Sequence, residues 1–390
     1  MPELPKRLLS IDVLRAVTML LMIFVNDASG VHHIPEWLDH AAANQDAMGF
    51  ADVIFPAFLF IVGLSLPFAI KNRIKKGDST AAILIYILTR SAALLIMGFY
   101  HVNLEEYNSA ALLPKAVWTL IITVAFFMIW LDYPEHFNKV KKNVLIGTGI
   151  ILLLLMALVY KGGNAEHATG MQPSWWGILG IIGWSYLVCA LSYFVLKGRL
   201  SLLIVFLIAF AGINIGVHTG VLSGGLWIIG DASSVTLTLF GMVISELYVD
   251  LVAKNKTHLL WIILLVTGIL LIALGLLIRP YAAGISKIHS TPAWIFICAG
   301  ITILTFESAI YLIDVKGKSN LFSLIKPAGT STLTCYLMPY FQVYLLQLFH
   351  VHYPPFLNNG AGGLLRAMAT AFILIWLVGL MEKKHLRLKI

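Results

Sequence analysis

Long runs of apolar residues, each about as long as a bilayer is thick, dominate this sequence. A helix needs about 20 consecutive apolar residues to cross the hydrocarbon core, where the chain must satisfy every backbone polar group itself. Hydrophobic residues fill 59% of the 390 positions and charged residues only 12%, whereas soluble domains carry about 25% charged residues. These features predict an all-α, polytopic integral membrane protein built as a helical bundle.

Twelve apolar runs are long enough to be membrane-spanning helices. No polar stretch between them is long enough for a separate soluble domain, so residues 1–390 are predicted to form a single transmembrane domain. The first run has Arg15 in its interior and no small-residue cleavage site behind it, which indicates a retained span rather than a signal peptide. The predicted spans lie near 10–28, 49–70, 81–101, 112–131, 143–160, 174–196, 200–218, 231–252, 258–278, 291–314, 326–349 and 363–381.

The distribution of lysine and arginine predicts the orientation of these spans, because cytoplasmic loops retain both residues. If both termini are cytoplasmic, twenty of these residues fall on the inner side, beginning with Lys6 and Arg7. Five fall on the outer side: Lys115, Lys161, Arg279, Lys287 and Arg366. The net charge of +8 therefore reflects topology and does not indicate nucleic acid as a partner. We expect a multi-pass protein of the cell inner membrane.

Several ionisable residues lie inside predicted spans, where by default they mark a functional site. They are Asp12, Arg15, Asp52, Arg90, Glu246 and Glu307. Asp12 and Arg15 are three residues apart and can pair on one helix face. An ion pair that only locks helices together explains Arg90, Glu246 and Glu307 equally well. Asp12, Arg15 and Asp52 are better explained by function, because of the residues around them.

The segment between Arg15 and Asp52 combines two span ends with a polar outer loop. The first span ends at Asn26, and the loop holds His32, His33, Glu36, Asp39 and His40. Nine of the twelve histidines are predicted at the outer side, and histidine is the side chain best suited to proton transfer near neutral pH. Acid–base chemistry is therefore expected to face outward. The loop has no recognised ligand motif such as His-Glu-x-x-His, so no metal is predicted.

Two blocks of this segment resemble a known family. The first is Ser10-Ile11-Asp12-Val13-Leu14-Arg15, followed by Val25-Asn26; the second begins at Asp39-His40-Ala41 and includes Ala51-Asp52-Val53-Ile54-Phe55-Pro56. Both are similar to the opening of the heparan-α-glucosaminide N-acetyltransferase family. Weaker similarity recurs at 90–98, 177–186, 286–294 and 311–314. As a set, these stretches resemble a bacterial branch of that family.

The resemblance implies a transmembrane N-acetyltransferase. Acetyl would pass from cytosolic acetyl-CoA, the co-substrate, to the amine of a glucosamine-type sugar or glycan at the outer face. His40 and Asn26 would form the reacting centre, with His40 as general base or as a nucleophile that carries the acetyl group. The residues expected to bind substrate are Asp52, Arg15, Asp12, Lys287 and Arg90. A homodimer is also expected from the family.

A secondary transporter of a sugar or small polar solute is the alternative. Twelve spans with both termini in the cytoplasm also fit transporters whose two halves repeat. The two halves of this sequence show no such repeat, and the loop at 71–78 lacks the Gly-x-x-x-Asp-Arg-x-Gly pattern of one large transporter superfamily. The sequence therefore favours the enzyme.

Overall fold

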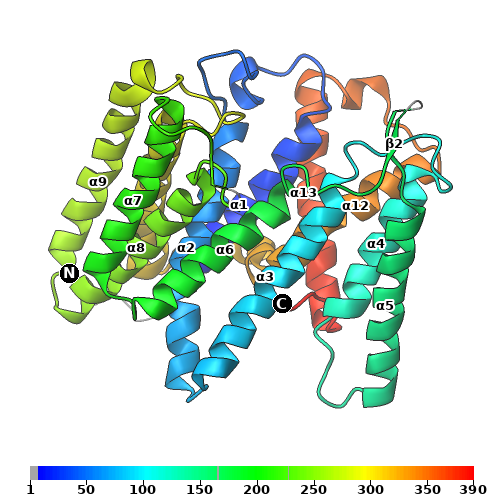
Figure 1. The fold of residues 1–390 in the computed structure, drawn as a ribbon, viewed down its shortest axis with the longest axis horizontal. Coiled ribbons are helices and arrows are strands. Elements are labelled where there is room, and N and C mark those ends of the chain that lie inside the picture. The colour runs from blue at the N-terminus through cyan, green and yellow to red at the C-terminus, as the bar shows by residue number, and fades with distance from the viewer. Residues whose placement is uncertain (1–7, 165–166, 227) are drawn as a thin grey trace.

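The computed structural model describes residues 8–164, 167–226 and 228–390, which form a helical bundle (Figure 1). The all-α class is confirmed. The helices are α1 (Leu9–Ala28), α2 (Ala51–Lys75), α3 (Thr80–Val102), α4 (Lys115–Trp130), α5 (Lys139–Val159), α6 (Gly177–Val195), α7 (Leu200–His218), α8 (Ser233–Ala253), α9 (Thr257–Ile278), α10 (Pro292–Ala309), α11 (Lys326–Thr330), α12 (Thr332–Leu348) and α13 (Gly360–Lys383).

Short elements fill the connections. A π-helical turn, Ile310–Val315, extends α10, and 3-10 turns lie at Glu36–Leu38 (η1), Arg279–Tyr281, Lys318–Ile325 and Pro355–Leu357. Two short strands, β1 (Gly162–Gly163) and β2 (Ala168–Thr169), pair antiparallel. Of these elements, η1 contributes residues to the pocket lining described below, and Arg279 of the turn Arg279–Tyr281 pairs with a lining residue.

Ten of the described helices are long and apolar enough to cross a membrane. Each of the twelve predicted spans contains a helix, but two fall short of that standard. α4 has only 16 residues, since its helix begins after Pro114. The predicted span 326–349 divides into α11 and α12, because Ser331 leaves helical geometry with φ −125° and ψ 45°. A count of twelve crossings therefore stays a prediction.

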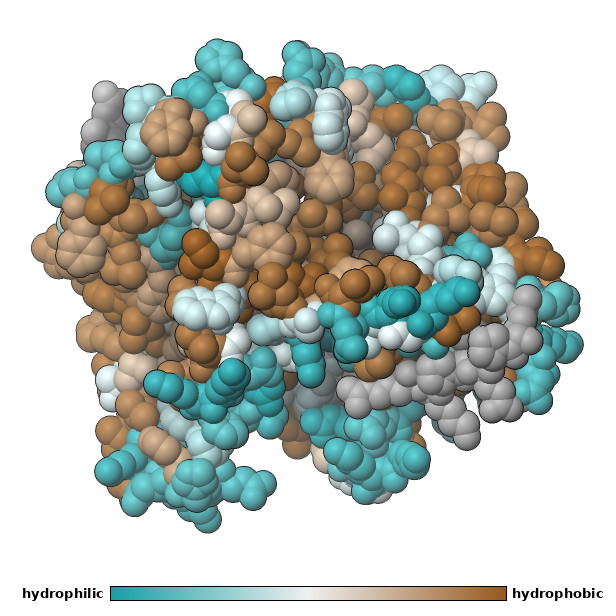
Figure 2. Space-filling model, turned by 180° about the vertical axis from the view of Figure 1, so that it is seen from behind, coloured by the Kyte–Doolittle hydropathy of each residue, from teal (hydrophilic) through white to brown (hydrophobic). Residues whose placement is uncertain are grey.

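The molecular surface supports a membrane location. Figure 2 shows a hydrophobic band across the middle of one face, with hydrophilic residues gathered towards its upper and lower edges. Large apolar side chains are exposed on the outer helices, among them Leu158 of α5 at 81% and Leu277 of α9 at 70%. Such exposure in water would be costly, so these helices are suited to contact lipid.

Loops predicted to share one side of the membrane do contact one another. The C-terminal tail pairs with the segment after α4 through a bridge between Leu131 and Leu388. On the predicted outer side, His32 pairs with Asn359 before α13. Loops predicted to lie on the same side of the membrane are thus in contact with each other, at both ends of the bundle. Which face is cytoplasmic stays a prediction, and Lys6 and Arg7 lie outside the described residues.

A close seam between α2 and α8 fixes the helix that begins at the candidate site. A Cβ atom added to Gly63 of α2 would lie 1.9 Å from the backbone oxygen of Thr238. A Cβ on Gly241 of α8 would lie equally close to the backbone oxygen of Phe60. Small residues at helix interfaces let backbones approach closely in membranes. The two glycines therefore act reciprocally, each making room for the backbone of the other helix.

Candidate active site

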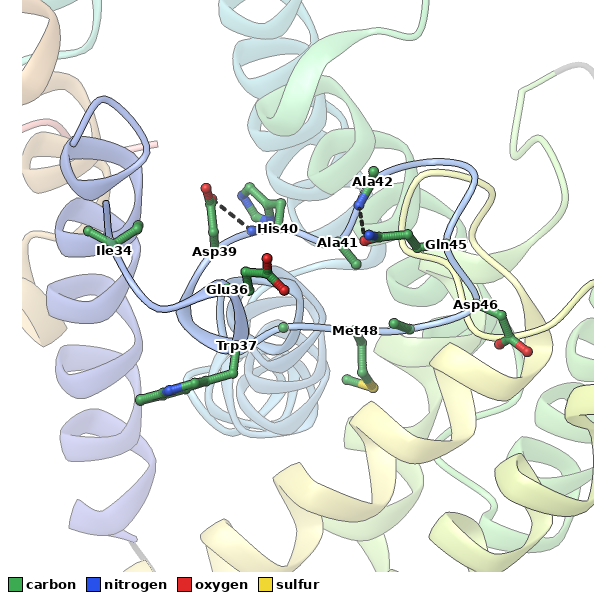
Figure 3. A pocket seen from close by; sticks show the side chains of 12 residues that line it. Ile34, Glu36, Trp37, Asp39, His40, Ala41, Ala42, Gln45, Asp46 and Met48 are labelled. Carbon is green, nitrogen blue, oxygen red and sulfur yellow. Dashed lines mark hydrogen bonds between the residues drawn. The ribbon is translucent and has the colours of Figure 1, made fainter. Parts of the chain in front are cut away.

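The loop between α1 and α2 folds into an open pocket of ≈ 680 Å³ at the predicted outer side (Figure 3). All twelve lining residues come from this loop, which includes η1. They are Ile34, Glu36, Trp37, Asp39, His40, Ala41, Ala42, Gln45, Asp46, Ala47, Met48 and Gly49. The pocket therefore stands directly above the start of α2, where Asp52 lies in the first turn.

Asp52 organises the floor of this pocket. Its side chain is only 1% exposed, and its Oδ2 accepts hydrogen bonds from the backbone N–H of Ala41 at 3.0 Å and of Gly49 at 2.9 Å. Its Oδ1 lies 2.6 Å from Nδ1 of His40. A buried carboxylate needs such partners. Asp52 therefore fixes both the loop backbone and the imidazole ring.

The Asp52 contact also sets the tautomer of His40. An ionised carboxylate can only accept hydrogen bonds, so Nδ1 of His40 carries a proton and donates it to Asp52 Oδ1. In the neutral ring, the lone pair then lies on Nε2. The His40 side chain is 32% exposed, which leaves it accessible from the pocket. A histidine that a carboxylate orients in this way is suited to accept a proton at Nε2.

Lys287 reaches the same histidine from the loop between α9 and α10. Its Nζ lies 3.1 Å from Nδ1 and 3.3 Å from Nε2 of His40, and 3.9 Å from Asp52 Oδ1. Burial lowers the pKa of Lys287, although the negative charges of Asp52 and Asp39 oppose this shift. The structure thus brings Lys287 to the His40–Asp52 pair, although Lys287 is 247 residues from His40 in the sequence.

An ion pair holds the Lys287 loop against the pocket. Nε of Arg279 donates to both carboxylate oxygens of Asp46, at 3.0 and 2.9 Å. Asp46 Oδ1 also accepts from the backbone N–H of Ile285 at 2.6 Å. This backbone hydrogen bond is the largest influence on Asp46 and lowers the pKa of its carboxyl group. Asp46 had no sequence motif to single it out.

Asn26 lies in a different place from His40. It lines a second pocket of ≈ 310 Å³ between the end of α1, α12 and α13. Asp27 and Arg366 also line this pocket, with Arg366 Nη2 lying 3.1 Å from Asp27 Oδ2. Asn26 is absent from the described lining of the His40 pocket. Its predicted role in the reacting centre stays a prediction.

Arg15 and Asp12 lie near the opposite end of the bundle, in the first turns of α1. Nη1 of Arg15 donates to Asp12 Oδ1 at 3.2 Å, which confirms the predicted pairing. Arg15 also donates to the side chain of Ser65 on α2 and to the backbone oxygen of Gly329 on α11. These contacts join three helices, while the Arg15 side chain remains 23% exposed.

Arg90 of α3 lies in an aromatic setting. Its Nη1 donates to the hydroxyl of Tyr86 at 3.2 Å, and its guanidinium lies 5.1 Å from the ring centre of Tyr186. Its charge is close enough to act on that of Arg15. Arg90 thus lies near the middle of α3, and neither arginine is among the described residues that line the His40 pocket.

Glu246 of α8 forms an ion pair with Lys71 of α2. A pair that locks helices together was one of the two explanations expected for this residue. Its Oε2 accepts from Nζ of Lys71 at 2.7 Å, and its Oε1 accepts from the hydroxyl of Tyr193 at 2.7 Å. These partners come from α2 and α6, so the network joins three helices at the predicted inner end of the bundle.

Comparisons with known proteins find similarity over part of the chain. The family model described as "Domain of unknown function (DUF5009)" matches residues 7–169. Human heparan-alpha-glucosaminide N-acetyltransferase is 35% identical over 100 residues, which are 26% of this chain and 14% of that protein. The mouse protein of the same name is 32% identical over 97 residues, 25% of this chain and 14% of its own length. Over about a quarter of its length, the chain is therefore similar to two proteins named as N-acetyltransferases, and the match covers only 14% of each of them.

Proposed function

We propose that this chain is a transmembrane N-acetyltransferase that moves acetyl from cytosolic acetyl-CoA to the amine of a glucosamine-type sugar at the outer face. The observation that carries the proposal is the buried Asp52, which contacts Nδ1 of His40 and so holds this histidine in the lining of an open pocket with its lone pair on Nε2. The partial similarity to acetyltransferases supports the same reaction class. In this proposal the bilayer is the inner membrane of a bacterial cell, and the working form is a homodimer.

The proposed reaction begins with the neutral amine of the acceptor. Its nitrogen attacks the thioester carbonyl carbon of acetyl-CoA, while His40 Nε2 takes the proton that the nitrogen releases. Collapse of the tetrahedral intermediate breaks the carbon–sulfur bond, and the proton on His40 passes to the departing thiolate to give free CoA thiol. General acid–base catalysis of this kind contributes about 10²–10⁴-fold in rate.

The negative oxygen of the intermediate needs a positive or hydrogen-bonding partner. Lys287 is suited to this role, because its Nζ lies beside both ring nitrogens of His40. The side-chain amide of Asn26 is the other proposed donor. Losing one donor of this type typically reduces kcat about 10²–10³-fold. Separate substitutions of Lys287 and Asn26 would therefore show which residue acts at this step.

The same geometry serves a relay through an acetylated histidine. In that scheme His40 Nε2 attacks the thioester carbonyl carbon, the carbon–sulfur bond breaks, and CoA leaves as a thiolate that takes a proton from solvent. The acceptor amine then attacks the acetyl group on His40, releases a proton to solvent and restores the neutral imidazole. Rapid mixing with acetyl-CoA alone distinguishes the two schemes. One equivalent of thiol released without acceptor indicates the relay, and release only after acceptor is added indicates direct transfer.

The donor must reach His40 from the opposite side of the bundle. We assign Arg15 and Arg90 to the anionic phosphates of acetyl-CoA, with its pantetheine arm extending through the bundle towards His40. The location of Arg15 in the first turns of α1 supports this assignment, as does its partial exposure. Arginine is well suited to bind phosphate in a bidentate manner. Asp12 holds Arg15 in place for that contact.

The proposal is tested by incubating the purified protein in detergent with acetyl-CoA and glucosamine while free thiol is measured. Thiol release that requires both the sugar and His40 supports an acetyltransferase with His40 in its reacting centre. His40→Ala provides the control, and its elution on size-exclusion chromatography checks folding. If the folded wild-type protein releases no thiol with any amino sugar, the proposal fails and the transporter alternative gains weight.

A further inference from the structure

The first turn of α2 contains a backbone carbonyl that lacks its usual helical donor. In an α-helix the carbonyl of one residue accepts from the N–H of the fourth residue after it. The fourth residue after Asp52 is Pro56, which lies inside α2 and has no N–H to donate. The buried carbonyl oxygen of Asp52 therefore needs a partner from outside its own helix. This is the same residue whose carboxylate contacts His40.

Helix α10 supplies that partner. Nε1 of Trp294 donates to the backbone oxygen of Asp52 at 3.0 Å, and Sγ of Cys298, one turn later, lies 3.9 Å from the same oxygen. Both side chains are buried. Residues four apart share a helix face, so one face of α10 packs on the first turn of α2. The indole N–H is the main donor, because a thiol donates only weakly.

The same end of α10 is tied to the loop that carries Lys287. The backbone N–H of Ser286 donates to Oγ1 of Thr291 at 3.0 Å, and the N–H of Thr291 donates to the backbone oxygen of Ser286 at 3.1 Å. Thr291 is the N-cap residue of α10, three positions before Trp294. A shift of α10 relative to α2 would therefore also move Lys287 relative to the Asp52 carboxylate.

We infer that Trp294 is a positioning residue: its indole holds the first turn of α2, and with it the Asp52 carboxylate, in contact with His40. This inference rests on the proposed function, because it adds a residue to the same site. Trp294 contacts none of the reacting atoms in this scheme and acts through the backbone of Asp52. Loss of the indole N–H should therefore reduce kcat and leave the KM values for acetyl-CoA and glucosamine unchanged.

The test compares Trp294→Phe with Trp118→Phe. Trp118 is a matched control, because its buried indole also donates to a backbone oxygen of another helix, that of Met156 at 2.9 Å, and it is absent from the described lining of the His40 pocket. For Trp294→Phe we expect kcat to fall about tenfold or more, since a misplacement of about 1 Å can cost about 10²-fold in rate. Trp118→Phe should keep kcat within about twofold. A kcat that stays near the wild-type value in Trp294→Phe, or that falls equally in both variants, would overturn the inference.

Pro56→Ala tests whether the carbonyl is the route. This substitution provides a backbone N–H that can donate to the Asp52 carbonyl within α2. In the Pro56→Ala background, Trp294→Phe should therefore change kcat by less than about twofold, because the carbonyl keeps a donor. An equally large loss of kcat with and without Pro56→Ala would show that Trp294 does not act through this carbonyl, and the inference would be wrong.

Amide hydrogen exchange separates this inference from the proposed function, because it needs no turnover. Asp52 Oδ2 accepts from the backbone N–H groups of Ala41 and Gly49, so a displaced carboxylate should release both. Hydrogen–deuterium exchange of the detergent-purified proteins, read by mass spectrometry, should be faster at these amides in Trp294→Phe and unchanged in Trp118→Phe. That result supports the inference even if no thiol is ever released. Exchange in Trp294→Phe as slow as in the wild type refutes it, whatever the outcome of the acetyl-transfer assay.

Discussion

Replacing Asp52 with asparagine tests the orientation of His40 with little change in volume. Asp52 accepts three hydrogen bonds, from His40 Nδ1 and from the backbone N–H groups of Ala41 and Gly49. An asparagine has only one acceptor oxygen. Turning that oxygen towards His40 would leave two backbone donors without acceptors, at about 1–3 kcal/mol each if they stay buried. The oxygen should therefore face the backbone, and the amide NH₂ should face His40.

The consequence is a reversed tautomer. An amide NH₂ can only donate to Nδ1, so the proton of the neutral ring moves to Nε2 and the base at the pocket is lost. Removing general base catalysis costs about 10²–10⁴ in rate, which corresponds to about 2.7–5.4 kcal/mol of barrier at 1.36 kcal/mol per decade. We expect kcat to fall within this range. The KM for acetyl-CoA should stay close to its wild-type value.

Initial rates of thiol release at saturating acetyl-CoA and glucosamine provide the measurement. Asp78→Asn is the matched control, since it removes a carboxylate that pairs with Arg73 at 2.8 Å on the opposite side of the bundle. It should leave kcat unchanged. An Asp52→Asn protein that elutes like the wild type and keeps kcat within about threefold would refute the orienting role.

Three further predictions concern the surroundings of the site. Lys287→Met removes the ammonium beside His40 and should lower kcat about 10²-fold; steady-state kinetics check this, and an unchanged kcat would count against the electrostatic role. Because the pKa of Asp46 is lowered on folding, its contribution to stability is present above its unfolded pKa of about 3.9 and is lost as pH falls through the lower folded value. The Tm difference between wild type and Asp46→Asn should therefore be present at neutral pH and disappear in acid, and a difference that persists there would contradict this account. Gly63→Ala should lower the free energy of unfolding by about 3 kcal/mol or more through overpacking. Gly147→Ala is the control and should leave the stability unchanged, because its added Cβ meets no atom within 4 Å. Equal Tm values for the two variants would show that the α2–α8 contact does not limit stability.

The helices were predictable because the bilayer restricts what an apolar run can become. Each predicted span contains a helix. The ends of the helices, however, depend on single residues whose effect on the backbone a hydropathy average does not include. Pro114 sets the start of α4 and shortens it to 16 residues. Ser331 divides α11 from α12 inside a run that reads as continuous. Hydropathy cannot reveal such a break, because the polarity of a residue does not depend on its backbone conformation. A single non-helical residue therefore leaves the apolar run unchanged.

The candidate site was predictable where its residues are close in sequence. His40 and Asp52 belong to one block, and their contact follows from the loop folding back onto the start of α2. Lys287 was expected to bind substrate, but its place beside His40 depends on the packing of the α9–α10 loop against the α1–α2 loop. Glu36 was visible as a loop carboxylate, yet only the structure shows which carboxylates have partners. Asn26 faces another pocket because α1 ends beside α12 and α13.

The reciprocal glycines between α2 and α8 limit how this protein can move. If α2 slid by one residue, Val62 or Leu64 would replace Gly63 against the backbone of Thr238. Even one Cβ atom added at Gly63 would lie 1.9 Å from the backbone oxygen of Thr238, so a larger side chain cannot fit there. The first turn of α2 carries Asp52, so this carboxylate keeps its register against α8. Any larger movement of α2 must therefore carry α8 with it. Local opening of the His40 pocket then falls to the loop between α1 and α2, which supplies all of its described lining.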